Sequence, residues 1–245
     1  MKKTLIAALM LNLISLAAQA AGTVEVHQAG VAKPLTLTNA ERLADLVAQP
    51  RLADSWWPGA VIASPQATAK AEREHQALLA RLAALAAEEG GSVGGAINAL
   101  RNQLQAMPVT GRLLVPLDPD TVRVHTENNP PLQGDYTLWV GHEPSTITLV
   151  GLVDKPGEKP FTPGRDVADY LDDISLLSGA DRSYAWVVYP DGRTQKAPVA
   201  YWNKRHIEPM PGSIVFVGFA DALWTNTYEA LNADILRSLS QRRPQ

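Results

Sequence analysis

The sequence has 245 residues, contains no cysteine and carries a formal net charge of −3 at pH 7. Without cysteine there is no disulfide framework, no thiolate nucleophile and no cysteine that could carry a lipid. The slightly negative net charge gives no electrostatic basis for nucleic-acid binding. We therefore expect a protein without a nucleic-acid partner that relies on its apolar core, with a length that allows one or two domains.

The first twenty residues follow the three-part pattern of a secretory signal peptide. Lys2 and Lys3 form a basic start, an apolar stretch runs from Leu5 to Ala18, and Ala18 and Ala20 supply the small residues before cleavage. The apolar stretch is too short to span a membrane, and no second long apolar run follows, so no transmembrane helix is expected. We expect export to the periplasm, with secretion beyond it as the alternative.

The first predicted domain covers residues 21–140 and consists mainly of short strands. Alternating apolar and polar residues, or short β-branched runs, predict the strands. They lie at residues 23–26, 35–38, 60–62, 113–115, 122–124 and 136–140. Asn39 is predicted to cap a short helix with Leu43, Leu46 and Val47 on one face.

A helical insertion interrupts this domain at about residues 66–107. Residues 66–88 are rich in strong helix formers, and Leu78, Leu82 and Leu85 form one apolar stripe. Gly90-Gly91 ends this helix, and residues 92–107 predict a second one. We expect an antiparallel helical hairpin whose first arm is about 34 Å long, projecting from the first domain.

The second predicted domain covers residues 141–220. Strands are expected at residues 146–150, 186–189, 197–200 and 214–217, with a hairpin turn at residues 190–192 and a helix that starts within residues 164–171. This order is typical of a β-grasp, a mixed sheet folded over one helix. Lys33-Pro34 and Lys159-Pro160 begin two stretches of similar order, which supports a duplicated domain weakly.

Residues 221–245 predict one amphipathic helix at the end of the chain. Its apolar face consists of Trp224, Tyr228, Leu231, Ile235 and Leu239. Arg237, Arg242 and Arg243 lie near the C-terminal end, where cations suit the helix dipole. The apolar face either packs on its own domain or docks a partner or a membrane surface, with Trp224, Tyr228, Leu231 and Ile235 as the contact residues.

No catalytic motif and no metal-ligand spacing is present, so we expect no enzyme, no cofactor and no metal. The pair Asp118 and Asp120 is more simply explained by a turn than by catalysis. The rival hypothesis is a polysaccharide-modifying enzyme, a hydrolase or transferase, in which carboxylates such as Asp118 and Asp135 converge on a sugar.

Two groups of residues are candidates for ligand binding. Arg112 follows the helical hairpin, with Asp118 and Asp135 nearby in sequence, and its guanidinium suits carboxylates and sugar hydroxyls. The alternative for Arg112 is an internal ion pair that holds the hairpin to the sheet. Trp202 and Arg205 belong to a run of aromatic and polar residues that could stack on a sugar. The alternative for Trp202 is burial in a strand.

Several motifs in order along the chain resemble the GfcC family of capsule biosynthesis proteins. They are Ser-Trp-Trp-Pro-Gly-Ala at residues 55–60, Thr-Gly-Arg-Leu at 110–113, Leu-Asp-Pro-Asp at 117–120, Val-Arg-Val at 122–124, Asn-Pro-Pro-Leu at 129–132, Gly-Asp-Tyr-Thr-Leu at 134–138 and Trp-Asn-Lys-Arg-His at 202–206. Together they cover nearly the whole chain after residue 20.

The resemblance implies an α+β fold of two β-grasp domains of the soluble-ligand-binding (SLBB) kind, the first with the helical hairpin, followed by the amphipathic helix. It implies a periplasmic, non-enzymatic role in capsule polysaccharide assembly or export, with the polysaccharide or an export-complex protein as partner. The same pieces are similar to domains of Wza-type polysaccharide exporters, so contact with the outer membrane through the C-terminal helix is a further alternative. The family's arginine after the hairpin matches Arg112 and lies in a pocket proposed for binding.

Overall fold

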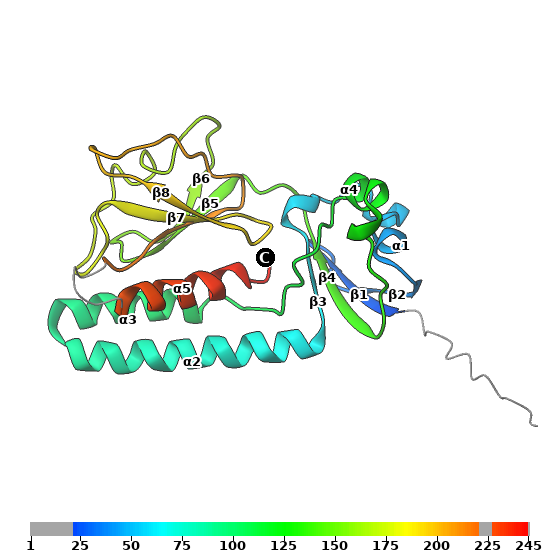
Figure 1. Cartoon of the computed structure of the whole chain (residues 1–245), viewed down its shortest axis with the longest axis horizontal. Coiled ribbons are helices and arrows are strands. Elements are labelled where there is room, and N and C mark those ends of the chain that lie inside the picture. Colours follow the sequence, from blue (N-terminus) through cyan, green and yellow to red (C-terminus); the bar gives the residue numbers. More distant parts are fainter. Residues whose placement is uncertain (1–21, 221–226, 245) are drawn as a thin grey trace, which may run out of the picture.

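The computed structural model describes residues 22–220 and 227–244 (Figure 1). The predicted signal peptide and Trp224 lie outside the described residues. The described part has an α+β fold with two mixed sheets side by side along the long axis and long helices beneath the second sheet. The predicted α+β class is therefore confirmed.

The first sheet has the strand order β2-β1-β4-β3. Its strands are β1 (Gly22–Gln28), β2 (Leu35–Ala40), β3 (Val61–Ala63) and β4 (Asp135–Val140). β1 and β4 pair in parallel, and the other two pairs are antiparallel. Val24 and Val26 are buried while Glu25 between them is exposed, so one face of β1 forms a core.

The helix α1 (Leu43–Val47) covers part of this face and buries its two leucines. It begins after Arg42 and not after Asn39, so the predicted cap is wrong. The carboxylate of Asp45 accepts a hydrogen bond from the backbone N–H of Arg42 at 2.9 Å. This bond makes Arg42 the N-cap, three residues after the predicted cap Asn39. Single turns of 3₁₀ helix lie at Pro50–Leu52, Trp57–Gly59 and Thr126–Asn128.

A second short helix, α4 (Pro119–Val124), replaces the strand that was predicted at residues 122–124. Asp118 is its N-cap, and the Asp118 carboxylate accepts a hydrogen bond from the backbone N–H of Thr121 at 2.8 Å. Pro119 occupies the first helical position, where its missing N–H costs nothing. This helix start signal overrides the strand preference of the β-branched residues that follow. Val122 is buried against the first sheet.

The strand predicted at residues 113–115 is also absent. The backbone N–H of Leu113 donates to the carbonyl of Ile62 in β3 at 2.9 Å. The N–H of Val115, however, turns back to the carbonyl of Leu113 at 3.0 Å. The chain therefore leaves the sheet edge after one hydrogen bond, which is too few for a strand.

The second sheet has the order β6-β5-β9-β7-β8. Its strands are β5 (Thr146–Gly151), β6 (Gly157–Pro160), β7 (Tyr184–Val188), β8 (Thr194–Pro198) and β9 (Ile214–Val217). β5 and β9 are parallel, and the other pairs are antiparallel. All residues of the central strand β9 are buried, and the predicted hairpin turn at residues 190–192 does join β7 to β8.

The helix that was predicted to start within residues 164–171 is replaced by a series of turns. The side chain of Asp166 accepts a hydrogen bond from the N–H of Asp169 at 2.9 Å. The guanidinium of Arg165 donates to the carbonyl of Asp169 at 2.6 Å. These side chains satisfy backbone groups that a helix would otherwise pair, and this competition explains the difference.

The long helices α2 (Pro65–Glu89), α3 (Gly91–Gln105) and α5 (Thr227–Ser240) lie beneath the second sheet (Figure 1). α2 follows β3 of the first sheet directly, and only Gly90, with a φ of 60°, separates it from α3. Buried leucines of α2 and α3 share one apolar core with the second sheet and with α5. The helical segment therefore leaves the first sheet, as expected, but it packs on the second sheet instead of projecting freely.

Candidate functional site

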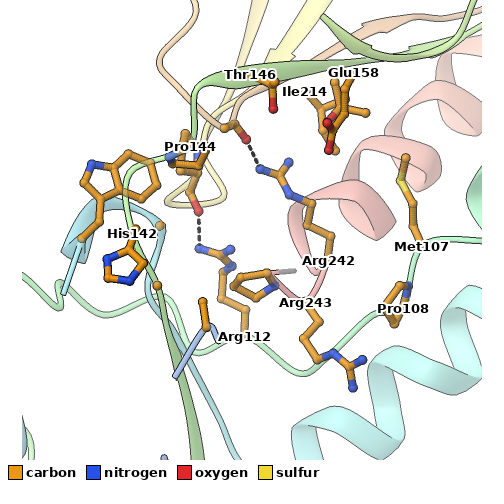
Figure 2. A pocket seen from close by; sticks show the side chains of 18 residues that line it. Met107, Pro108, Arg112, His142, Pro144, Thr146, Glu158, Ile214, Arg242 and Arg243 are labelled. Atoms are coloured by element: carbon orange, nitrogen blue, oxygen red, sulfur yellow. Dashed lines mark hydrogen bonds between the residues drawn. The ribbon is translucent and has the colours of Figure 1, made fainter. Parts of the chain in front are cut away.

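A cavity of about 330 Å³ lies between the first sheet, the edge of the second sheet and the end of the chain (Figure 2). Its volume lies at the lower end of the range for small-molecule pockets. Its lining includes Trp56, Arg112, His142, Glu158, Arg242 and Arg243.

Arg112 enters this cavity from the irregular segment behind α3. Gly111 lies so close to the first turn of α2 that a Cβ atom would be 2.0 Å from the carbonyl carbon of Ala67, so glycine is required here. The backbone N–H of Arg112 donates to the side-chain oxygen of Gln241 at 2.7 Å. These contacts tie the segment to α2 on one side and to the residues after α5 on the other.

The side chain of Arg112 is only 8% exposed. One terminal nitrogen donates to the backbone carbonyl of Pro190, in the turn between β7 and β8, at 2.8 Å. The Nε atom is buried and has no hydrogen-bond partner among the described residues. The internal ion pair considered from the sequence is not formed with any described carboxylate; the contact is a neutral carbonyl instead.

Arg242 enters the same cavity from the segment after α5, and Figure 2 shows both guanidinium groups pointing into it. One terminal nitrogen donates to the carbonyl of Gly212, and the other is buried without a described partner. Sequence reasoning assigned Arg242 only to the helix dipole. No spacing motif links residues 112 and 242, because their proximity depends on the whole fold.

The surroundings of both guanidinium groups disfavour their charged forms. Burial lowers the pKa of Arg112 to about 10, opposed by the nearby carboxylate of Asp191. Burial also lowers the pKa of Arg242 to about 10, and the charge of Arg112 adds to this effect. Both groups therefore stay charged at neutral pH, and Asp191 itself pairs with Arg193 at 2.5 Å.

Comparison with protein families relates the chain to capsule biosynthesis. The family model "Capsule biosynthesis GfcC, N-terminal" matches residues 20–143, and "Capsule biosynthesis GfcC C-terminal" matches residues 155–244. The chain belongs to the GfcC family. The uncharacterized protein YjbG of Escherichia coli (strain K12) is 64% identical over 245 residues, which cover 100% of both chains.

The cavity combines residues from both halves of this GfcC-family chain. Arg112 lies in the part matched by the N-terminal family, and Arg242 lies in the part matched by the C-terminal family. Neither half alone contains both guanidinium groups, so the pocket depends on how the two halves are placed.

The structure does not bring Asp118 and Asp135 to Arg112. Asp118 is exposed and caps α4, and Asp135 is exposed at the start of β4. Neither carboxylate lines the cavity. The carboxylate that does line it is Glu158 of β6, which sequence reasoning passed over because it follows an ordinary turn.

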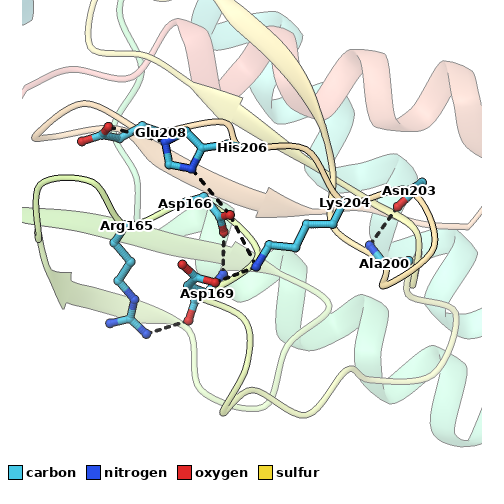
Figure 3. Close-up of polar contacts among 8 residues, drawn as sticks. All are labelled: Arg165, Asp166, Asp169, Ala200, Asn203, Lys204, His206 and Glu208. Atoms are coloured by element: carbon cyan, nitrogen blue, oxygen red, sulfur yellow. Dashed lines mark hydrogen bonds and ion pairs between the residues drawn. The ribbon is translucent and has the colours of Figure 1, made fainter.

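Trp202 and Arg205, the other predicted pair, lie together in a shallow hollow beside β7 and β8, which Lys196 also lines. The Trp202 side chain is 72% exposed, so it is not buried in a strand. Figure 3 shows how the supporting turn is held: Asn203 accepts a hydrogen bond from the N–H of Ala200 at 3.0 Å, and Lys204 contacts Asp169 at 2.7 Å.

The apolar face of α5 is used inside the chain. Leu231 and Ile235 are 1% and 0% exposed and belong to the core beneath the second sheet. Tyr228 is partly buried, stacks on Phe219 with ring centroids 5.1 Å apart and contacts Glu89 at 3.1 Å. A partner could reach Leu231 and Ile235 only if α5 left the core.

Among residues 22–220 and 227–244, no group of three or more histidines and acidic residues is placed to hold a metal ion. Within the same residues, every helix is too short or too polar to cross a bilayer.

Proposed function

We propose that this GfcC-family chain is a periplasmic factor for capsule polysaccharide assembly or export that binds glycan or an export-complex protein and catalyses no reaction. The observation that carries the proposal is the buried, incompletely paired Arg112 in a cavity built by both family halves. A pocket with few convergent polar groups is suited to binding. The N-terminal sequence pattern supports the periplasmic location.

The finer fold assignment is part of the same proposal. We propose that each sheet belongs to a β-grasp unit of the soluble-ligand-binding kind, with α2 and α3 as an inserted helical hairpin. In both sheets the first hairpin is followed by a parallel pairing, between β1 and β4 and between β5 and β9. Superposition of the two sheets in an experimental structure would test it, and strands that do not coincide would contradict it.

A complementation experiment tests the function. A strain that lacks the gene receives the wild-type chain, Arg112→Gln, or the control Arg123→Gln, which removes an exposed cation of α4 that does not line the cavity. We expect the wild type and Arg123→Gln to restore surface polysaccharide and Arg112→Gln to lose most of it at an unchanged protein level. Full restoration by Arg112→Gln would contradict a role for the pocket.

The same strains distinguish the two binding candidates and the enzymatic alternative. Trp202→Ala removes the exposed indole of the shallow hollow beside β7 and β8. Loss of polysaccharide in this variant alone would indicate that this hollow, and not the Arg112 cavity, binds the ligand. Incubation of the purified chain with capsule glycan should leave the glycan chain length unchanged. Shortening that disappears in Glu158→Gln or Asp135→Asn would overturn the non-enzymatic part of the proposal.

A further inference from the structure

The cavity holds one buried cation, Arg112, and one half-buried cation, Arg242, neither of which forms an ion pair with a described residue. Neither Arg112 nor Arg242 forms an ion pair with any carboxylate in residues 22–220 and 227–244. Each donates to one backbone carbonyl and keeps a buried N–H without a partner. Buried charges in proteins are usually paired, because the desolvation of an unpaired ion is unfavourable.

The lining does not compensate for these charges. Arg112, Arg242 and Arg243 line the cavity with one carboxylate, Glu158, which is exposed and pairs with none of them among the described residues. The charges also act on one another, since Arg112 contributes to the lowered pKa of Arg242. A group with negative charge and several hydrogen-bond acceptors would both compensate the positive charges and accept hydrogen bonds from the unpaired N–H groups.

Both guanidinium groups are held in place before any ligand arrives. The carbonyl of Pro190 fixes Arg112, and the carbonyl of Gly212 fixes Arg242 (Figure 2). The backbone of Arg112 is held by Gln241, one residue before Arg242, so a hydrogen bond connects the two segments directly. Such preorganised forks match the planar or tetrahedral geometry of carboxylate and phosphate oxygens.

We propose that the cavity binds an oxyanion, a carboxylate or phosphate, carried by a single sugar unit, with Arg112 and Arg242 as its binding residues. This inference rests on the proposed function, because only the capsule pathway points to a sugar. The volume of about 330 Å³ suits a small ligand, and the indole of Trp56 supplies an apolar wall on which a sugar ring can stack. The pocket would thus recognise an acidic unit of a polysaccharide or a phosphorylated sugar.

Titration calorimetry on the purified full chain tests the ligand class. The probes are glucuronic acid, glucose 6-phosphate, inorganic phosphate and glucose, each at about 50 mM and 500 mM salt. We expect one of the two acidic sugars to bind at least tenfold more tightly than glucose and to weaken at high salt. The acid that binds identifies the source of the oxyanion. Equal binding of glucose, or no binding of any probe, would overturn the proposal.

The inorganic phosphate arm separates the two parts of the inference. Weaker binding of inorganic phosphate than of glucose 6-phosphate supports a sugar subsite at Trp56. If only inorganic phosphate binds, the sugar part is overturned and the oxyanion part stands.

Variants then assign the binding residues. Arg112→Gln and Arg242→Gln remove the charge and shorten the side chain, but keep a neutral polar amide. Each should weaken binding of the tightest probe at least tenfold. Arg237→Gln, an exposed cation of α5 outside the cavity, is the matched control and should bind as the wild type does. Unchanged binding in Arg242→Gln would overturn its assignment.

Thermal shift measurements keep the test decisive if a variant is unstable. The tightest probe should raise the melting temperature of the wild type and of Arg237→Gln, and raise it much less for either pocket variant. Failure of the oxyanion inference can be distinguished from failure of the proposed capsule function. A chain that supports capsule production but shows no oxyanion preference refutes this inference alone, whereas oxyanion binding without a capsule phenotype refutes the proposed function.

Discussion

Buried polar side chains in this protein fall into a paired group and an unpaired group. Asn232 donates to the carbonyl of Phe219 and accepts from its N–H, both at 2.9 Å, so it ties α5 to the strand end behind β9. Arg112 and Arg242, by contrast, each keep an orphan N–H. A buried donor without a partner costs about 1–3 kcal/mol. The paired group therefore stabilises the fold, whereas the orphan donors of Arg112 and Arg242 lower its stability.

His75 of α2 belongs to the paired group, and it predicts a dependence of stability on pH. Its Nδ1 atom lies 2.7 Å from the hydroxyl of Ser238 in α5, and burial lowers its pKa below the ordinary value of 6.5. The unfolded chain therefore binds a proton near pH 6.5, while the folded chain binds it only at lower pH. The free energy of unfolding contributed by neutral His75 is complete above pH 6.5 and is lost as the pH falls below it.

Thermal melts of the wild type and His75→Gln at pH 7.5, 6.5, 5.5 and 5.0 check this prediction. We expect the melting temperature of the wild type to fall more between pH 7.5 and 5.0 than that of His75→Gln, whose amide stays neutral. The other histidines are common to both proteins and cancel in the difference. Parallel curves for the two proteins would contradict it.

At the scale of elements, α5 shows how an amphipathic pattern is used. Its apolar side joins α2, α3 and the second sheet in one core, and its exposed side carries charges such as Asp234, which pairs with Arg81 of α2 at 2.8 Å. The same pattern on the sequence suits docking to a partner equally well. Only the presence of a complementary apolar surface within the chain decides between the two.

Ile235→Ala tests the packing of α5. Ile235 is fully buried, so its truncation should lower the free energy of unfolding by about 2–5 kcal/mol, through lost apolar burial and a residual cavity. Glu229→Ala on the exposed side of the same helix is the control, with an expected change within about 0.5 kcal/mol. Chemical denaturation measures both values. A loss of capsule function in Ile235→Ala without loss of stability would instead indicate a docking role.

The elements that the sequence predicted correctly are those whose pattern depends on one dominant signal. The β7–β8 hairpin follows from its turn residues, and the long helix α2 follows from its composition and its apolar stripe. The errors at residues 122–124 and 164–171 arose where side chains of Asp118 and Asp166 bond to nearby backbone. Such local competition changes the element without changing its apolar pattern.

The site was predictable only in part, for a related reason. Arg112 was found because the segment behind the helices carries a recognisable motif. Arg242 was missed because its position in the cavity depends on α5, on Gly212 and on the backbone bridge to Val109, all distant in sequence. Asp118 and Asp135 are near Arg112 in sequence, but α4 and β4 place them outside the lining of the cavity.

At the scale of the whole molecule, the two sheets repeat one plan. The order β2-β1-β4-β3 matches β6-β5-β9-β7, with the parallel pair at the same place in each sheet. The helices α2 and α3 break this symmetry, because they follow a strand of the first sheet and pack beneath the second. The two halves are thereby joined by a shared core and by the cavity that holds both arginines.

This arrangement predicts that the second half depends on the first. The chain can be divided in the irregular segment between β4 and β5, into fragments 22–143 and 144–245. The fragment 144–245 lacks the buried leucines of α2 and α3 that complete its core, so alone it should melt without cooperativity and bind a hydrophobic dye. When the fragments are mixed, we expect a 1:1 complex with a cooperative melt.

Matched substitutions in the fragment 22–143 make this test specific. Leu82→Asp places a charge in the shared core and should abolish complex formation, because Leu82 is fully buried against the second half. Leu114→Asp, at a leucine that is 78% exposed, should leave it intact. Size-exclusion chromatography and circular dichroism report both results. A cooperative melt of 144–245 alone, at the temperature of the full chain, would show that the second half folds without α2 and α3.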